Sequence, residues 1–337
     1  MKKLFLSVVA TVLATVGFAQ SNLVATLCHG DSISTFYGTD ALNNAHSAAV
    51  EGDVITLSSG TFSAPGILNK GIVLRGAGMF TDTINGIAPT IVTGGEILFQ
   101  GSSDNKLKIE GIYFNCTISL YSKFQHKNAS FVRCRLSTVR CWYSNFTTTN
   151  MQNLSFINCY VSEALHLRGT VSVINCVVKD LEADSPILNI SNSVLLYING
   201  PDTSNFMAGI GNSTISNCYI CTDSNPNISI PASTQLYNNV ADYASTIRNA
   251  TNTSNKVIAT SNVFKTFRKS SSYNEDETFE LTSEAASTYL GNDGTQVGIY
   301  GGTLPFDPTP TYPRLVKCNV AGKSAQDGTL SVELKIE

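Results

Sequence analysis

Short segments of alternating apolar and polar residues, each centred on a cysteine, recur along the middle of the chain. They are IYFNCTI (112–118), FVRCRLS (131–137), FINCYVS (156–162), VINCVVK (173–179) and ISNCYIC (215–221). A degenerate copy, ISNSVLL (190–196), has Ser193 in the cysteine position. Alternation with period two predicts β-strands, and regular recurrence predicts that each strand belongs to one repeat of a stacked structure.

The spacing of the segments is typical of a β-solenoid. From Cys116, the central positions follow after 18, 25, 17, 17 and 25 residues, ending at Cys218. One coil of such a fold takes about 20 residues or more, and insertions in its turns lengthen individual coils. The sequence therefore predicts an all-β fold made of stacked parallel coils.

The same alternation places the cysteines on one inward row: Cys116, Cys134, Cys159, Cys176 and Cys218. It predicts inward apolar flanks at Phe114, Ile118, Val132, Leu136, Ile157, Val161, Ile174 and Val178, and asparagines beside the row at Asn115, Asn158, Asn175 and Asn217. The row is either a metal or redox site or a ladder of small buried side chains. The five cysteines are not in CxxC pairs with one another, which favours the ladder. Parallel Cβ vectors give poor disulfide geometry, so we expect mostly free thiols and leave Cys28, Cys221 and Cys318 open.

Residues 38–78 carry a second pattern. Thr39 is expected to cap a short helix over Asp40 to Ala49, and the strands VITLSSGTF and GIVLRGAG follow. This stretch resembles the opening of right-handed parallel β-helix proteins of the pectate-lyase-like superfamily, of the secreted bacterial type. The similarity covers about residues 40–270. It implies a right-handed parallel β-helix whose open end is covered by the helix, and it says little about function.

The ends of the chain predict further units. Residues 1–19 have the basic start, short apolar run and small residues of a secretory signal peptide, so we expect a mature chain from about Gln20, in the periplasm, at the cell surface or secreted. No later segment is apolar for long enough to span a membrane. Residues 20–290 are assigned to the β-helix with its N-terminal cap. Residues 291–337 are assigned to a closing strap and a hairpin packed on the last coil, after a short helix capped by Ser283.

Composition narrows the function classes. The net charge is −3 and charged residues make up 14 %, which argues against a general nucleic-acid binder. HExxH and GxSxG are absent, so zinc-hydrolase and serine-hydrolase motifs have no support. Residues 292–295 could hold calcium, but the scarcity of nearby carboxylates favours a plain Asp-Gly turn, and no cofactor is expected.

One outer face gathers candidate chemistry. The resemblance implies a substrate that lies along one outer sheet, as in pectate-lyase-like enzymes. There the substrate contacts acidic residues and a basic residue. Counting from the cysteine row places His166 near Glu182 and Arg168 near Asp184 on adjacent coils. The candidate catalytic residues are Arg168, Glu182, Asp184 and His166, and the candidate substrate-binding residues are Arg140, Trp142, Asp180 and Tyr197.

Two functions fit this face. The first is binding or adhesion to an extracellular polysaccharide or a cell-surface glycan, without catalysis. The second is cleavage of an acidic polysaccharide by a lyase or glycoside hydrolase mechanism. Opposite charges on neighbouring strands also stabilise a solvated sheet, and the chain lacks a paired Asp-Asp or a DxD run. We therefore favour binding, and leave open whether the protein is an enzyme.

Overall fold

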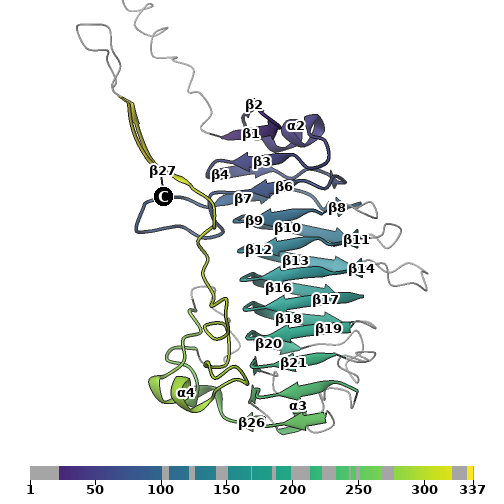
Figure 1. Cartoon of the computed structure of the whole chain (residues 1–337), viewed down its shortest axis with the longest axis vertical. Coiled ribbons are helices and arrows are strands. Elements are labelled where there is room, and N and C mark those ends of the chain that lie inside the picture. Colours follow the sequence, from purple (N-terminus) through teal and green to yellow (C-terminus); the bar gives the residue numbers. More distant parts are fainter. Residues whose placement is uncertain are drawn as a thin grey trace, which may run out of the picture.

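The computed structural model describes residues 23–100, 106–120, 126–141, 151–167, 169–183, 187–198, 213–221, 233–242, 244–247, 251–267, 277–320 and 332–336. The chain is a parallel β-solenoid in which each coil gives one strand to each of two long sheets (Figure 1). This confirms the all-β fold predicted from the recurring segments. The expected signal peptide lies outside the described residues. Within them, no helix is long and apolar enough to cross a membrane.

The two sheets, here called sheet A and sheet B, each contain twelve strands. Sheet A runs in the order β2 (Ser32–Tyr37), β1 (Val24–His29), β3 (Val54–Leu57), β6 (Val73–Arg75), β9 (Lys108–Glu110), β12 (Ser130–Val132), β15 (Leu154–Ile157), β17 (Thr170–Ile174), β19 (Ile187–Ser191), β21 (Thr214–Ser216), β23 (Gln235–Tyr237) and β25 (Thr251–Thr253). Sheet B contains β4 (Gly60–Ser63), β7 (Thr90–Thr93), β10 (Tyr113–Leu120), β13 (Arg135–Cys141), β16 (Tyr160–Leu167), β18 (Val177–Ala183), β20 (Val194–Ile198), β22 (Tyr219–Ile220), β24 (Val240–Ala241) and β26 (Lys256–Val257), with β5 (Ile67–Leu68) and β8 (Ile97–Phe99) beside them.

The remaining elements are short. β11 (His126–Lys127) pairs with β14 (Met151–Gln152), and β27 (Leu315–Val320) pairs with β28 (Val332–Ile336). The helical segments are α2 (Ala41–Ala48), α3 (Ala244–Ile247), the 3-10 turn η1 (Thr260–Asn262) and α4 (Ser283–Thr288).

The core fills the space between the two sheets. Equivalent residues of successive coils lie above one another, so like side chains stack along the axis. Phe131 and Phe156 stack with ring centroids 5.1 Å apart, and Phe99 lies 5.7 Å from Phe131. All three side chains are buried, and such ring pairs add to the free energy gained by burying their area.

From β9 onward, a single residue in the left-handed conformation turns the chain from each sheet A strand into the following sheet B strand. We call these residues the left-handed column: Gly111, Arg133, Asn158, Asn175, Asn192, Asn217, Asn238 and Ser254. Asparagine suits this place because it adopts positive φ more readily than most residues. The backbone ladder continues through the turn, as when Asn158 N–H donates to the Ile174 carbonyl at 3.0 Å.

The next residue of each turn points into the core. We call this set the inward turn row: Cys134, Cys159, Cys176, Ser193, Cys218, Asn239 and Asn255. Each of these side chains except that of Cys134 accepts a hydrogen bond from the backbone N–H of the row member before it. Cys159 N–H donates to Cys176 Sγ at 3.3 Å, Cys176 N–H to Ser193 Oγ at 3.1 Å, and Cys218 N–H to Asn239 Oδ1 at 2.9 Å. The row therefore supplies acceptors for buried N–H groups that would otherwise lack one.

The thiols of the inward turn row are free and buried, as the ladder interpretation requires. Burial raises the pKa of Cys218 to about 12 and holds the pKa of Cys134 and Cys159 well above the ordinary value. The seven cysteines whose side chains the structure describes are all free. The expectation that these side chains act only as small apolar groups is incomplete, because they also accept and donate hydrogen bonds.

The predicted phase of the alternation is wrong in part. Cys116 does not belong to the row: Phe114 pairs with Leu136, so Ile112 occupies the place equivalent to Cys134. Asn115 is correspondingly exposed. The predicted inward flanks Val132, Ile157 and Ile174 are half-exposed, and Phe131, Phe156 and Val173 point inward instead. The left-handed residue causes this, because it bends the chain between the two sheets and shifts the alternation, so that Phe131 and Cys134, on either side of Arg133, both point inward.

The caps also differ from expectation in detail. Helix α2 covers the interior of the first coil with Ala41, Leu42 and Ala45, all buried, but its N-cap residue is Asp40 and no side chain caps it. Helix α4 is capped by Thr282, whose hydroxyl accepts from Ala285 N–H at 3.1 Å, and the expected cap Ser283 is its first residue.

Replacement of Cys176 tests the hydrogen-bonding role of the inward turn row. C176S keeps an acceptor and a donor, as Ser193 does one coil later, and is expected to retain nearly the wild-type melting temperature. C176V preserves volume but removes the acceptor of Cys159 N–H, and is expected to cost about 1–3 kcal/mol. Thermal and urea unfolding of both variants measure the difference. Equal stabilities would show that the thiol contributes by packing alone.

Candidate functional site

The register brings together the described members of the predicted outer face. His166 of β16 pairs with Glu182 of β18, and Asp180 of β18 pairs with Tyr197 of β20. Leu165 and Leu181, which alternate with them, are buried, so His166 and Asp180 lie on the outer side. The predicted neighbours His166 and Glu182 are therefore confirmed as backbone partners. Trp142, Arg168 and Asp184 lie outside the described residues.

Arg140 follows the same outward alternation, one residue beyond the buried Val139. Its guanidinium forms an ion pair with Glu96 at 3.1 Å, and its Nε lies 3.5 Å from Ser119 Oγ. Ser119 also donates to Glu96. Glu96 was not among the predicted residues, and it joins Arg140 to the coil on the N-terminal side. Both charged side chains are about one-third exposed, so the pair adds little to stability.

A second outer feature was not predicted. The first residues of the sheet B strands form an outer column: Tyr113, Arg135, Tyr160, Val177, Val194, Tyr219, Val240 and Lys256. Its members from Tyr160 to Val240 are buried although they point away from the coil interior. The segment after the last coil covers them with Val263, Phe264, Phe267, Phe279, Leu281, Ala285, Val297 and Ile299.

The cover thins toward the N-terminal coils and leaves a groove. The groove has a volume of about 630 Å³, within the range of ligand-binding pockets. Its floor is the outer column from Tyr113 to Val177, and its walls come from residues 79–81 and from the C-terminal segment. We call this the aromatic groove, after its six rings: Phe80, Tyr113, Tyr160, Phe279, Tyr300 and Phe306.

Two of these rings contact one guanidinium group. Arg135 lies with its guanidinium carbon 4.2 Å from the centroid of the Tyr113 ring and 5.8 Å from that of Phe80. Such cation–π contacts fix a cation against the rings. Phe80 meets Tyr160 edge to face at 5.6 Å, which holds the wall against the floor. Glu277 adds a carboxylate at the rim, where it accepts from Thr266 Oγ1 at 2.8 Å.

A strap formed by residues 291–314 supplies one wall of the groove. It runs beside the left-handed column from the last coils back toward the first (Figure 1). Asn217 and Asn292 exchange hydrogen bonds at 2.9 and 3.1 Å, and Asn175 Nδ2 donates to the carbonyls of Ile299 and Gly301 at 2.8 and 2.7 Å. A Cβ on Gly301 would lie 1.8 Å from the Gln296 carbonyl oxygen, so this close approach requires glycine.

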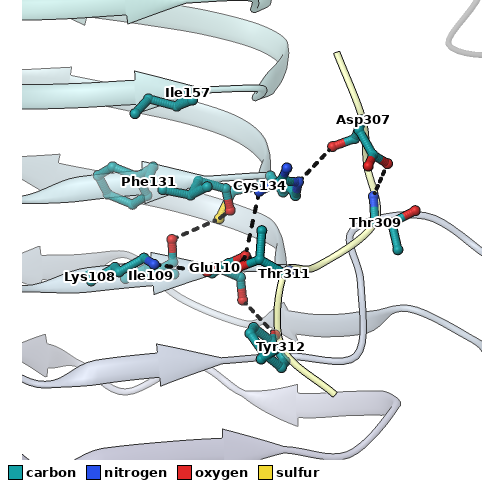
Figure 2. A network of polar contacts seen from close by, with 12 residues as sticks. Lys108, Ile109, Glu110, Phe131, Cys134, Ile157, Asp307, Thr309, Thr311 and Tyr312 are labelled. Carbon is teal, nitrogen blue, oxygen red and sulfur yellow. Dashed lines mark hydrogen bonds and ion pairs between the residues drawn. The ribbon is translucent and has the colours of Figure 1, made fainter. Parts of the chain in front are cut away.

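The strap is fastened to the N-terminal coils at Glu110, as Figure 2 shows. Thr311 donates to the carboxylate of Glu110 from its N–H at 2.8 Å and from its hydroxyl at 2.6 Å, and Lys108 lies 3.1 Å away. Burial by itself would raise the pKa of Glu110, but the hydrogen bonds from Thr311 and Lys108 outweigh it and keep the pKa below its ordinary value. Arg133 of the left-handed column donates to the Asp307 carbonyl at 3.0 Å.

The strap ends at the first coils, and this corrects the expected place of the hairpin. Tyr312 donates to the Gly76 carbonyl, and Arg314 forms a largely buried ion pair with Asp82 at 2.9 Å. Hydrogen bonds from Asn85 and the contact with Arg314 lower the pKa of Asp82 to about 2. Because β27 begins at the next residue, the hairpin starts beside the first coils and not on the last one (Figure 1).

The described residues contain no group of three or more His, Cys, Asp or Glu side chains arranged to hold a metal ion. In the loop considered for calcium, Asp293 Oδ1 accepts from Thr295 N–H at 2.9 Å and from its hydroxyl at 2.7 Å. That carboxylate oxygen therefore stabilises the turn, and the pattern is that of an Asx turn.

No family model, curated protein or solved structure matches this chain.

Loss of the Asp82 charge tests the attachment of the strap. The folded-state pKa lies below the ordinary aspartate value of about 4, so the carboxylate stabilises the fold above that pH and loses this effect as the pH falls toward 2. D82N is expected to melt at a lower temperature than wild type at pH 7. The difference should shrink as the pH falls from about 4 through 2, as followed by circular dichroism.

D40N is the matched control, because Asp40 is exposed and its side chain does not cap α2. The melting temperature of D40N should not differ from that of wild type in this pH-dependent way. A gap between D82N and wild type that stays constant with pH would contradict the role of the ionised carboxylate.

Proposed function

We propose that this chain is a secreted or surface-exposed β-helix of the pectate-lyase-like superfamily that binds extracellular carbohydrate in the aromatic groove. The ligand is a polysaccharide or a cell-surface glycan, and binding requires no catalysis. The observation that carries the proposal is the groove itself: an open site of about 630 Å³ that combines six aromatic rings with Arg135.

The chemistry of the groove suits a sugar chain. A pyranose ring has an apolar C–H face and a rim of hydroxyl groups, so its site needs flat apolar surface beside hydrogen-bonding groups. Phe80, Tyr113, Tyr300 and Phe306 are half-exposed and offer such surface. Arg135 offers donors in a fixed plane, and Glu277 offers an acceptor at the rim.

The groove is also held in shape before a ligand arrives. The floor belongs to the regular sheet, and the strap is fastened at Glu110 and Asp82. Tyr300 is fixed by its hydroxyl, which donates to the Thr278 carbonyl at 2.8 Å. A preformed site loses less conformational entropy on binding, which supports affinity for a ligand of modest size.

A second function, cleavage of an acidic polysaccharide, draws on a different observation. The register pairs His166 with Glu182, and Asp180 and Tyr197 lie on the same sheet. An imidazole and a carboxylate on adjacent strands could serve general acid–base cleavage. This face lies on the distal half of the sheet B strands, away from the aromatic groove.

Truncation of the groove rings tests binding. Y113A and F306A each remove half-exposed aromatic surface and are expected to weaken glycan binding at least about tenfold, a loss of about 1.4 kcal/mol. The measurement is isothermal titration with the glycan selected from a panel of acidic and neutral polysaccharides. Y237A is the control, since Tyr237 is a half-exposed aromatic residue on sheet A, outside the groove.

Binding that survives Y113A and F306A unchanged would contradict the groove as the site. A sizing column run on each polysaccharide with the protein separates the two functions. Intact glycan that co-elutes with the protein supports binding. Shortened glycan shows an enzyme, new ultraviolet absorbance identifies a lyase, and loss of cleavage in H166A and E182Q would place the reaction on the distal face.

A further inference from the structure

The strand β2 forms an unprotected edge of sheet A. It pairs with β1 on one side and ends the sheet on the other, and no other described strand reaches it. Figure 1 shows β2 at the end of the stack, next to α2. The helix covers the interior of the first coil, but β2 still presents a row of backbone N–H and C=O groups at the rim.

The sequence of β2 contains none of the features that usually block an edge. Natural edge strands carry charges, proline or bulges, or are very short. β2 has six residues, SISTFY, without charge, proline or glycine, and its six pairs with β1 follow without a register shift. It also exposes large side chains, since Ile33 is 70 % and Tyr37 is 53 % exposed.

We propose that β2 is a self-association surface, through which a second copy of this chain adds antiparallel to β2 and joins two solenoids end to end. A two-fold axis through Thr35, perpendicular to the sheet, keeps the outer faces of both copies on the same side. Ile33 of one copy then lies opposite Tyr37 of the other, twice. Pairs of an aromatic and a β-branched residue stabilise antiparallel strands.

The charge pattern selects a second copy as the occupant. Because β2 carries no charge, the symmetric pairing brings no like charges together, and Asp31 of one copy falls opposite Thr39 of the other. A two-fold contact also closes on itself, because it occupies the β2 edge of both copies, so it produces a dimer and not a fibre. This inference is independent of the aromatic groove, which lies on sheet B.

Sedimentation velocity of the chain from Gln20 onward, over a concentration series, tests the proposal. Wild type is expected to form a dimer. T35K sets two lysines directly opposite each other at the axis and is expected to weaken dimerisation at least about tenfold. I187K is the control, because Ile187 is an exposed residue of β19 in the interior of sheet A.

A cysteine placed on the axis gives a second readout. T35C should form a disulfide-linked dimer on mild oxidation. S34C should form far less, because Ser34 lies opposite Phe36 of the other copy and not opposite itself. A monomer at every concentration, or a dimer that T35K does not weaken, would overturn the proposal. Equal crosslinking of T35C and S34C would overturn the register.

Discussion

The buried N–H that follows each left-handed turn residue constrains the whole fold. This N–H points into the core, where no water can accept a hydrogen bond from it. The side chain of the inward turn row in the next coil accepts that hydrogen bond instead. Cys176, Ser193 and Asn239 accept this hydrogen bond through a sulfur, a hydroxyl oxygen and an amide oxygen. This shared role explains why these residue types replace one another along the row. The hydrogen bonds are made between coils, so each coil depends on the presence of its neighbour, as in other solenoids.

The same turns determine where the strap and the groove lie. The asparagines of the left-handed column direct amide groups outward, and the strap binds them along its length. The strap leaves the outer column at the N-terminal coils, where Tyr113 and Arg135 remain half-exposed. The aromatic groove is therefore a consequence of the path of the strap. A chain whose C-terminal segment covered the entire outer column would have no such site.

The recurring cysteine was enough to predict stacked coils, because the hydrogen-bonding constraint repeats once per coil. It was not enough to predict the phase, because Asn158 and its equivalents interrupt the alternation. Cys116 resembled a member of the row only through its local sequence. The sequence signal for the outer column is a set of apolar doublets, since consecutive apolar residues indicate a strand buried on both faces. They are Tyr160-Val161, Val177-Val178 and Val194-Leu195. The groove itself joins Phe80, Tyr113 and Phe306, which lie too far apart in sequence for a local pattern to connect them.

Hydrogen–deuterium exchange with and without a bound glycan tests most directly the claim that the strap and the outer column together form the binding site. The account predicts that a bound glycan slows exchange in three segments together, in peptides covering residues 78–91, 110–114 and 297–308. Protection confined to residues 164–182, or exchange that no glycan alters, would contradict it.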